Sequence, residues 1–317
     1  MEDLPPRSRS NQKDPLERYT NADMPTVQLH LPHSLYNFVE NDTRRKWWNL
    51  EGSKLLVAPF DEEIYDPELH HDIKGRILAA IADITLSKTA SIAAQTISKE
   101  DKEKGHIPTT FVIYKLSETH RQILLQRRVW ASINIAFCVA PLEPACPDFL
   151  FSIQGYITLG NDSTESTVKE VWNDTKTKQF FQSLIDEAPV ATHPTLRTAL
   201  SNFVNSMWIS QLNIRTRGNS LSPEFNVYAK GSFISDTDLW TRIRDFLAER
   251  AYINEVQGEG FAVVAPHFCR LCHGRDHPKG LCPFPKVEGW PAAKNTSTAH
   301  QQKGGRSTRS RRAPRAH

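Results

Sequence analysis

The sequence predicts an α+β protein with two small units, followed by a compact segment rich in cysteine and histidine and by a basic tail. Three observations favour this architecture. The chain has 317 residues, enough for about two domains. Its composition, 39% hydrophobic and 9% aromatic, is sufficient to form real cores. Short apolar runs alternate with longer amphipathic segments along the chain, and none approaches the roughly 20 apolar residues of a membrane span.

Five segments are expected. Residues 1–30 are polar and proline-rich, and they are predicted to be disordered. A first αβ unit is expected over 31–132 and a second over 133–265. The segment 266–285 holds the cysteines and histidines, and 286–317 is predicted to be a disordered basic tail.

The first unit contains two clear strand patterns and two helix patterns. Apolar runs predict strands over 54–60 and 110–116. A helix is expected to begin at Pro67, because proline is favoured in the first turn. Its apolar positions share one helical face: Leu69, Ile73, Ile77, Ile81 and Ile84. Ser117 is placed to cap a second helix that ends at about residue 130.

The second unit is expected to open with a strand over 133–140. Helical patterns then lead to two alternating strands, over 211–215 and 225–230. A helix beginning near Ser235 and a short strand over 261–265 complete the unit. This order of β, helices, β, β, α, β is the ferredoxin-like order, which RNA-recognition modules also use.

The polar face of the predicted strand 225–230 carries Tyr228 and Lys230. The aromatic signature of a standard RNA-recognition strand is absent from the sequence. We therefore expect an ordinary solvated face, with contact to a base or a phosphate as the alternative.

Near the C-terminus, three cysteines and one histidine follow the spacing C-x2-C-x4-H-x4-C: Cys269, Cys272, His277 and Cys282. Three thiolates and an imidazole complete a tetrahedral shell around one Zn²⁺. Because four good ligands leave no open position for water, we predict that Zn²⁺ has a structural role.

Other interpretations of this motif are open. The run C-x-x-C-H at 269–273 also matches a haem-attachment pattern, which leaves Cys282 unused. The two leading cysteines would form a reactive redox pair at a helix N-terminus, but the glycines and proline that follow disfavour a helix. His273 or His267 is the alternative to His277 as the fourth ligand.

The positive charge of the chain is concentrated at one end. Residues 266–317 contain eleven Lys and Arg and two acidic residues, so they carry +9, whereas the other 265 residues carry −6. This distribution favours contact between the C-terminal end and nucleic-acid phosphates. The candidate phosphate contacts are Arg270, Arg275 and Lys279 in the motif, and Arg306, Arg309, Arg311, Arg312 and Arg315 in the tail. Leu271 is a candidate for an apolar contact with a base.

The motif resembles the CCHC zinc knuckle of retroviral and retrotransposon Gag nucleocapsid proteins. It differs from that family at three positions, where Arg270 replaces an aromatic residue and His273 and Asp276 replace glycines. Three longer sequence segments are similar to uncharacterised Gag-like proteins of mushroom-forming fungi. Those proteins resemble the product of the first open reading frame of non-LTR retrotransposons. The segments are HPKGLCPFP…GW (from His277 to Trp290), APLEPACPDFLF (140–151) and FNVYAKG (225–231).

The resemblance implies a zinc-dependent protein of the Gag or ORF1 type that binds single-stranded RNA or DNA with weak sequence specificity. The alternative is a protein-interaction or self-assembly module with a structural zinc site, and self-association is compatible with both.

No phosphate-binding loop, nucleophile elbow or metalloprotease motif occurs, so no enzymatic activity is expected. Neither a membrane nor a small-molecule substrate is expected as a partner. Five cysteines, an odd number, disfavour a disulfide framework, and we expect the chain in the cytoplasm or the nucleus.

Overall fold

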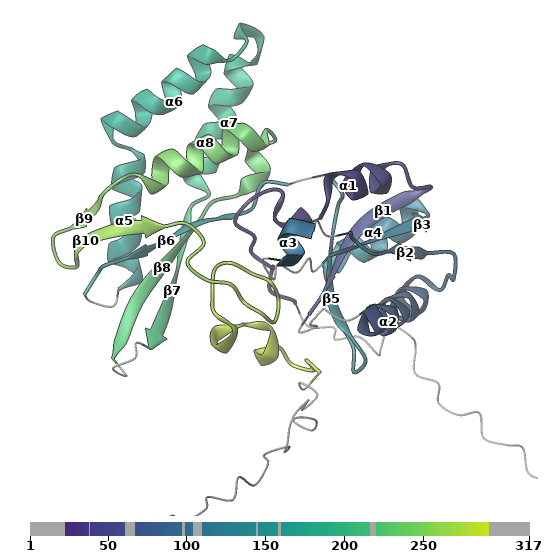
Figure 1. Ribbon diagram of the computed structural model, residues 1–317. Helices are drawn as coiled ribbons and strands as arrows, with labels where there is room; N and C mark the ends of the chain where they lie inside the picture. The colour runs from purple at the N-terminus through teal and green to yellow at the C-terminus, as the bar shows by residue number, and fades with distance from the viewer. Residues whose placement is uncertain are drawn as a thin grey trace, which may run out of the picture.

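The computed structural model describes residues 23–37, 39–60, 67–96, 99–103, 110–143, 145–157, 160–215 and 220–291. Within these ranges the chain is an α+β protein with two antiparallel sheets, as predicted (Figure 1). The tail arginines Arg306, Arg309, Arg311, Arg312 and Arg315 lie outside the described residues. No helix in the described ranges is long and apolar enough to cross a membrane.

The first sheet has five strands in the order β2-β3-β1-β5-β4. The strands are β1 (Ser53–Pro59), β2 (Ser91–Ala93), β3 (Phe111–Leu116), β4 (Val129–Ala131) and β5 (Ala136–Ala140). The helices of this unit are α1 (Asn41–Trp48), α2 (Pro67–Thr85), α3 (Lys99–Glu103) and α4 (Glu118–Arg127). Ser117 caps α4 as predicted, because its hydroxyl accepts the amide of His120 at 3.1 Å.

The second sheet has five strands in the order β7-β8-β6-β10-β9. The strands are β6 (Phe149–Gln154), β7 (Trp208–Arg215), β8 (Leu221–Tyr228), β9 (Tyr252–Asn254) and β10 (Gly258–Val263). The helices are α5 (Asn161–Trp172), α6 (Thr175–Glu187), α7 (His193–Asn205) and α8 (Thr237–Ala248). The cap of α8 is Asp236 rather than Ser235, since its carboxylate accepts the amides of Asp238 and Leu239.

The two sheets have the same topology. In each, the first strand lies between the third and the fifth, the second is at one edge and the fourth is at the other. Without that fourth strand, this is the ferredoxin-like order, which the sequence predicts for the second unit only. The units differ in the connection between their first two strands, which is α2 in one unit and α5 to α7 in the other.

The strand that was expected to open the second unit belongs to the first sheet. The predicted strand 133–140 is β5, which pairs with β1 and places Ala140 opposite Leu56 and Cys138 opposite Ala58. The second sheet begins at β6 instead. The apolar run of β6 has no two-residue alternation, so periodicity alone does not distinguish it from a buried helical segment.

The longest helices of each unit cover one face of its sheet. In the first unit, α2 and α4 pack Ile73, Ile77, Ile81 and Leu124 against Leu55, Val57, Phe111 and Phe137. In the second unit, α5 and α8 pack Val168, Trp172, Trp240 and Ile243 against Phe151, Phe225 and Val227. The extensive contacts between described helices and strands all lie within one unit or the other. On the opposite face of the first sheet, Trp47 of α1 packs with Leu56 and Val112, and the rest of this face contacts other parts of the chain.

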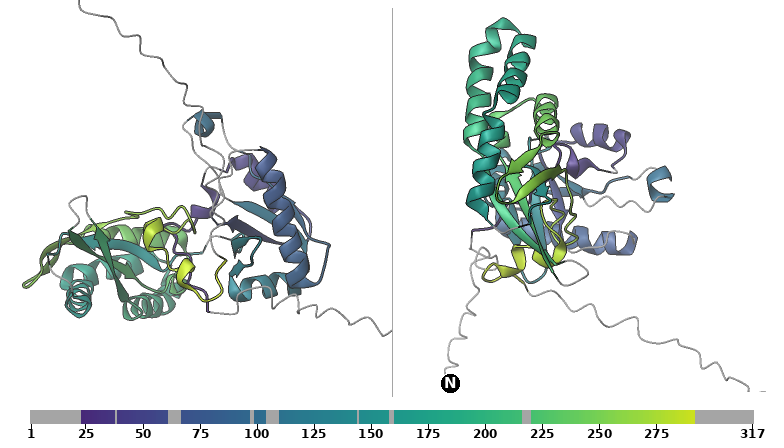
Figure 2. Two further views of the ribbon diagram at one scale, coloured as in Figure 1. Left: turned by 90° about the horizontal axis from the view of Figure 1, so that it is seen from below. Right: turned by 90° about the vertical axis from the view of Figure 1, so that its left-hand side faces the viewer.

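Two segments lie between the units, and both approach the opposite faces of the sheets (Figure 1 and the left view of Figure 2). We call residues 264–291 the C-terminal loop and residues 23–37 the N-terminal strap. Met24, Val27 and Leu35 of the strap pack against the same apolar cluster as the cysteines of the loop. Residues 23–30 were predicted to be disordered, but packing against distant parts of the chain orders them. Local composition gives no information about such packing.

Candidate metal centre

A tight turn starts the metal-binding part of the C-terminal loop. The amide of Cys269 donates to the carbonyl of Gly274 at 2.8 Å, and the amide of His273 donates to the carbonyl of Cys269 at 2.7 Å. His273 has φ +64°, in the left-handed region that closes such turns. The turn places the first two cysteines side by side. A 3₁₀ turn over Lys279–Leu281 then brings the chain back to Cys282.

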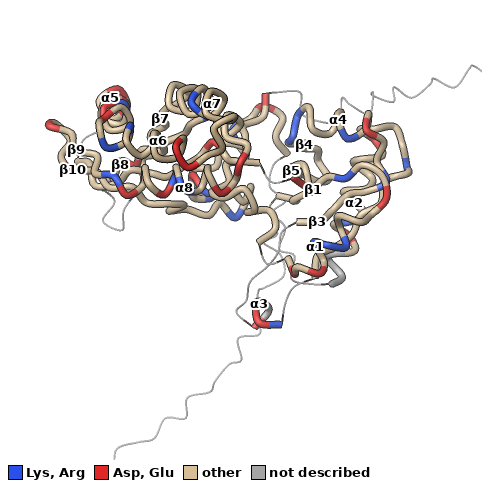
Figure 3. Tube along the Cα trace, turned by 90° about the horizontal axis from the view of Figure 1, so that it is seen from above, with Lys and Arg blue, Asp and Glu red and all other residues tan. Residues whose placement is uncertain are grey.

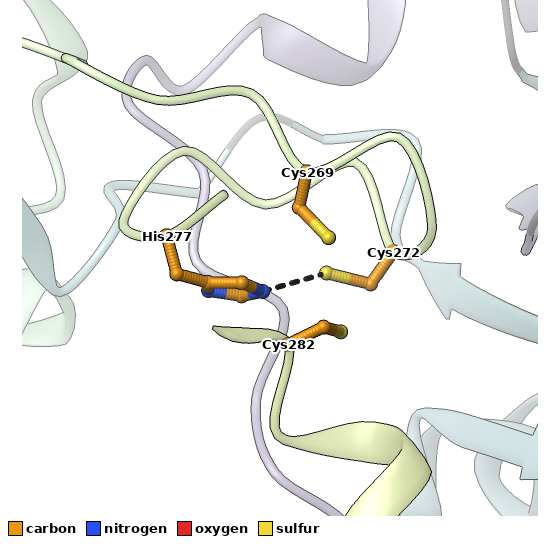
Figure 4. A group of neighbouring side chains, drawn as sticks. All are labelled: Cys269, Cys272, His277 and Cys282. Carbon is orange, nitrogen blue, oxygen red and sulfur yellow. Dashed lines mark hydrogen bonds between the residues drawn. The ribbon is translucent and has the colours of Figure 1, made fainter. Parts of the chain in front are cut away.

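The four predicted ligands converge on one point. Their ligand atoms all lie within 4.8 Å of one another, and all four side chains are buried (Figure 4). Cys272 Sγ lies 3.5 Å from His277 Nε2. Zn–S and Zn–N bonds of about 2.3 and 2.0 Å at a tetrahedral angle would separate these two atoms by about 3.5 Å. The cluster is therefore geometrically compatible with zinc binding by Cys269, Cys272, His277 and Cys282.

A neighbouring carboxylate fixes the orientation of the histidine ring. Asp276 Oδ1 lies 2.6 Å from His277 Nδ1, so Nδ1 is assigned a proton, and its N–H donates a hydrogen bond to the carboxylate. In the neutral ring, Nε2 then has a lone pair available for a metal ion held with the cysteines. A carboxylate behind the ligating imidazole is the usual arrangement at protein zinc sites, because it selects the tautomer and makes the ligand more basic.

The cysteine side of the loop packs on the first sheet. Ala58, Phe60, Val129 and Cys138 form an apolar cluster with Cys269, Leu271, Cys272, Cys282 and Phe284. The ring of Phe284 lies edge-on to Phe60 at 4.9 Å, and His273 Nε2 lies 2.8 Å from the carbonyl of Pro59. The metal-binding turn is thus part of the core on the face of the first sheet opposite α2 and α4.

The histidine side of the loop contacts the second sheet. The hydroxyl of Tyr228 donates to Asp276 Oδ2 at 2.9 Å, and the side-chain amide of Asn226 (Nδ2) donates to the Asp276 main-chain carbonyl at 2.7 Å. His267 Nε2 lies 2.7 Å from a carboxylate oxygen of Glu224. The polar face of β8 is therefore not the solvated face that was expected, because the C-terminal loop covers it.

These contacts decide between the alternative ligands. His273 turns away from the cysteines toward Pro59, and His267 pairs with Glu224. Neither completes the metal cluster, so His277 is the histidine that belongs to it. The haem-attachment pattern would use His273 as its histidine, and this side chain is buried in the loop's packing against the first unit.

The protons of the site compete with a metal ion. Burial by itself lowers the pKa of His277, but hydrogen bonds to Asp276 and to the cysteine thiols outweigh it and raise the pKa to about 11. Hydrogen bonds with Cys272 and Cys282 lower the pKa of Cys269, whereas hydrogen bonds with Cys269 and Cys282, together with burial, raise the pKa of Cys272. Zinc binding requires thiolates and a neutral imidazole, so it must release protons from this cluster.

The predicted nucleic-acid contacts of the loop differ in accessibility. Arg270 and Lys279 are exposed, and Arg275 is half-buried. Leu271 was expected to touch a base, but it is only 9% exposed and packs on the first sheet. In this position the apolar side chain holds the turn against β1 and β5, and its contact with a base stays a prediction.

Sequence reasoning missed an aromatic residue beside the motif. Phe268, directly before the first cysteine, is 44% exposed. The guanidinium of Arg275 lies over its ring at 4.6 Å. In the zinc knuckles that the motif resembles, the aromatic residue follows the first cysteine, so inspection of that position alone overlooks Phe268.

Comparison with protein-family models finds no match, and the same is true of comparisons with curated proteins and with solved structures.

Proposed function

We propose that this protein binds single-stranded nucleic acid, with RNA as the first candidate. Zinc holds the C-terminal loop in the conformation that binds. The main support is the charge of +9 over residues 266–317 beside −6 for the rest of the chain. Figure 3 shows Lys and Arg interspersed with Asp and Glu over both units. Phosphates would therefore be attracted to the C-terminal end.

The exposed rim of the loop has side chains suited to a nucleic-acid strand. Arg270, Lys279 and Lys286 are exposed and cationic. Phe268 offers an exposed ring, with Arg275 beside it. Aromatic rings stack on bases of any identity, and lysine and arginine side chains bind the phosphates along the backbone. This combination supports binding with weak sequence preference.

Zinc itself supplies no attraction for phosphate here. Three thiolates and one Zn²⁺ sum to a charge of −1. Affinity must come from the flanking cations, and the role we propose for the metal is structural. On the same spacing of ligands we propose the finer assignment, a Gag or ORF1-like protein derived from a retrotransposon.

Salt dependence tests the proposal directly. The affinity of the zinc-loaded full chain for a labelled single-stranded RNA should fall steeply as salt rises, as counterion release requires. The double variant Arg270→Ala/Lys279→Ala removes two phosphate contacts, so the log–log slope should flatten by about 1.4. Arg197→Ala/Arg242→Ala removes the same charge from α7 and α8 and should leave the slope unchanged. Absence of RNA binding at low salt would refute the proposal.

A self-assembly module with structural zinc is the second candidate. It is favoured by the burial of the metal-binding turn between the two units, which is unusual for a loop whose only task is to contact a ligand. The variant Cys282→Ser separates the candidates. Loss of oligomers with intact RNA binding would support self-assembly, whereas loss of RNA binding would support the first proposal.

A further inference from the structure

We propose that the second αβ unit completes the zinc site, because Tyr228 and Asn226 of β8 hold Asp276, and Asp276 holds the ligand His277. The three are positioning residues, since none of them is a metal ligand. The inference concerns zinc affinity and does not depend on nucleic-acid binding.

A continuous path of hydrogen bonds leads from β6 to the imidazole ring of the ligand His277. The hydroxyl of Ser152 donates to Asn226 Oδ1 at 2.5 Å, and Asn226 Nδ2 donates to the Tyr228 oxygen at 3.1 Å. Tyr228 donates to Asp276 Oδ2 at 2.9 Å, and His277 Nδ1 donates to Asp276 Oδ1 at 2.6 Å. Every donor in this path has an acceptor, so the proton positions are mutually consistent.

The path is buried, which makes it strong and specific. Asn226 is 1% exposed and Tyr228 is 5% exposed. Buried hydrogen bonds act in a low dielectric, and a missing partner leaves an unsatisfied polar group. Burial and the nearby Asp276 carboxylate raise the pKa of Tyr228 far above its usual value. The phenol therefore remains protonated and remains the donor to Asp276.

The carboxylate of Asp276 has two different neighbours for its two oxygens. One oxygen faces the metal ligand in the same loop, and the other faces a side chain nearly 50 residues earlier in the chain. The Asp276 carbonyl accepts from Asn226 as well, so β8 holds this residue at both its main chain and its side chain. A shift of β8 would thus move the carboxylate and rotate the imidazole.

The cysteines of the same site are held by the other unit. Cys269, Cys272 and Cys282 pack with Ala58 and Cys138 of the first sheet. The shell is complete only when the faces of both sheets are in place. Because coupling between two equilibria is reciprocal, zinc must favour the docked arrangement by the same factor by which docking raises zinc affinity.

Zinc affinity of the full chain tests this inference, measured by competition with a chromophoric chelator. Loss of a partner behind a ligating histidine typically lowers metal affinity about 10–100-fold. We expect about a tenfold loss for Tyr228→Phe, which keeps the ring and removes the hydroxyl. A larger loss is expected for Asp276→Asn, which disturbs both oxygens.

Tyr156→Phe is the matched control. Its hydroxyl is also buried and donates to the Tyr252 carbonyl at 2.9 Å, within the second unit and away from Asp276. This variant should bind zinc as the unmodified chain does. Cobalt-loaded Tyr228→Phe should retain the thiolate-to-cobalt charge-transfer band, since all four ligands stay in place.

Three results would overturn the inference. One is an unchanged affinity of Tyr228→Phe, even with a weakened Asp276→Asn, because the role of Asp276 would then be local to the loop. Another is an equal loss in Tyr156→Phe, which would indicate general destabilisation of the sheet. The third is loss of the charge-transfer band in Tyr228→Phe at saturating cobalt, which would mean that the ligand set had changed.

Discussion

Replacement of Phe284 by alanine should strongly destabilise the protein, because this ring anchors the C-terminal loop on the first unit. Phe284 is fully buried, with the rings of Phe60 and Trp290 at 4.9 and 5.4 Å. Removing a buried phenylalanine typically costs about 3–5 kcal/mol of unfolding free energy. Urea unfolding of the zinc-loaded chain, followed by tryptophan fluorescence, measures this loss. With a slope of about 3 kcal/mol per molar urea, the midpoint should fall by about 1 M or more.

Phe268→Ala is the control for this experiment. It removes the same side chain from the same loop, but at a position that is 44% exposed. Its cost should stay within about 1 kcal/mol. Equal destabilisation by the two variants, or no effect of Phe284→Ala, would refute the packing of the loop on the first sheet.

Two further predictions concern titratable groups. Burial, with Arg275 and Arg244 nearby, lowers the pKa of His30 to about 4, whereas an unfolded histidine titrates near about 6.5. Between these two pH values the unfolded chain binds more protons than the folded chain, so the free energy of unfolding should fall as pH decreases from about 6.5 to 4. The variant His30→Gln should reduce the slope of that fall, which urea unfolding at several pH values measures. Burial also raises the pKa of Cys138 to about 12 and that of Cys146 to about 11, so both thiols should react slowly with Ellman's reagent at pH 7.5. Chelation of zinc should release Cys269, Cys272 and Cys282, and so add three thiols that react fast with the reagent. Three fast-reacting thiols before chelation would contradict a zinc-bound cluster.

The sequence predicts the local features of this protein well. The apolar positions of α2, the Ser117 cap and the set of four ligands all follow from short-range patterns. The ligand set is predictable because the whole site lies within one loop of 14 residues. Periodicity and spacing carry such information directly.

Long-range packing accounts for what the sequence does not predict. The alternation over 225–230 shows that Asn226 and Tyr228 share a polar face, but it does not show that the C-terminal loop binds there. Leu271 likewise has the same sequence context whether it faces a base or the first sheet. The placement of β5 depends on pairing with β1, more than 70 residues earlier in the chain. Contacts of this kind can be predicted only when it is known which faces of the two sheets meet.

Zinc is expected to hold the two αβ units together through the C-terminal loop. The most direct measurement is small-angle X-ray scattering of the full chain, before and after removal of zinc by a chelator. We predict that the radius of gyration increases on chelation and returns to its first value when zinc is added back. An unchanged radius of gyration in a protein that has lost its zinc would contradict the coupling.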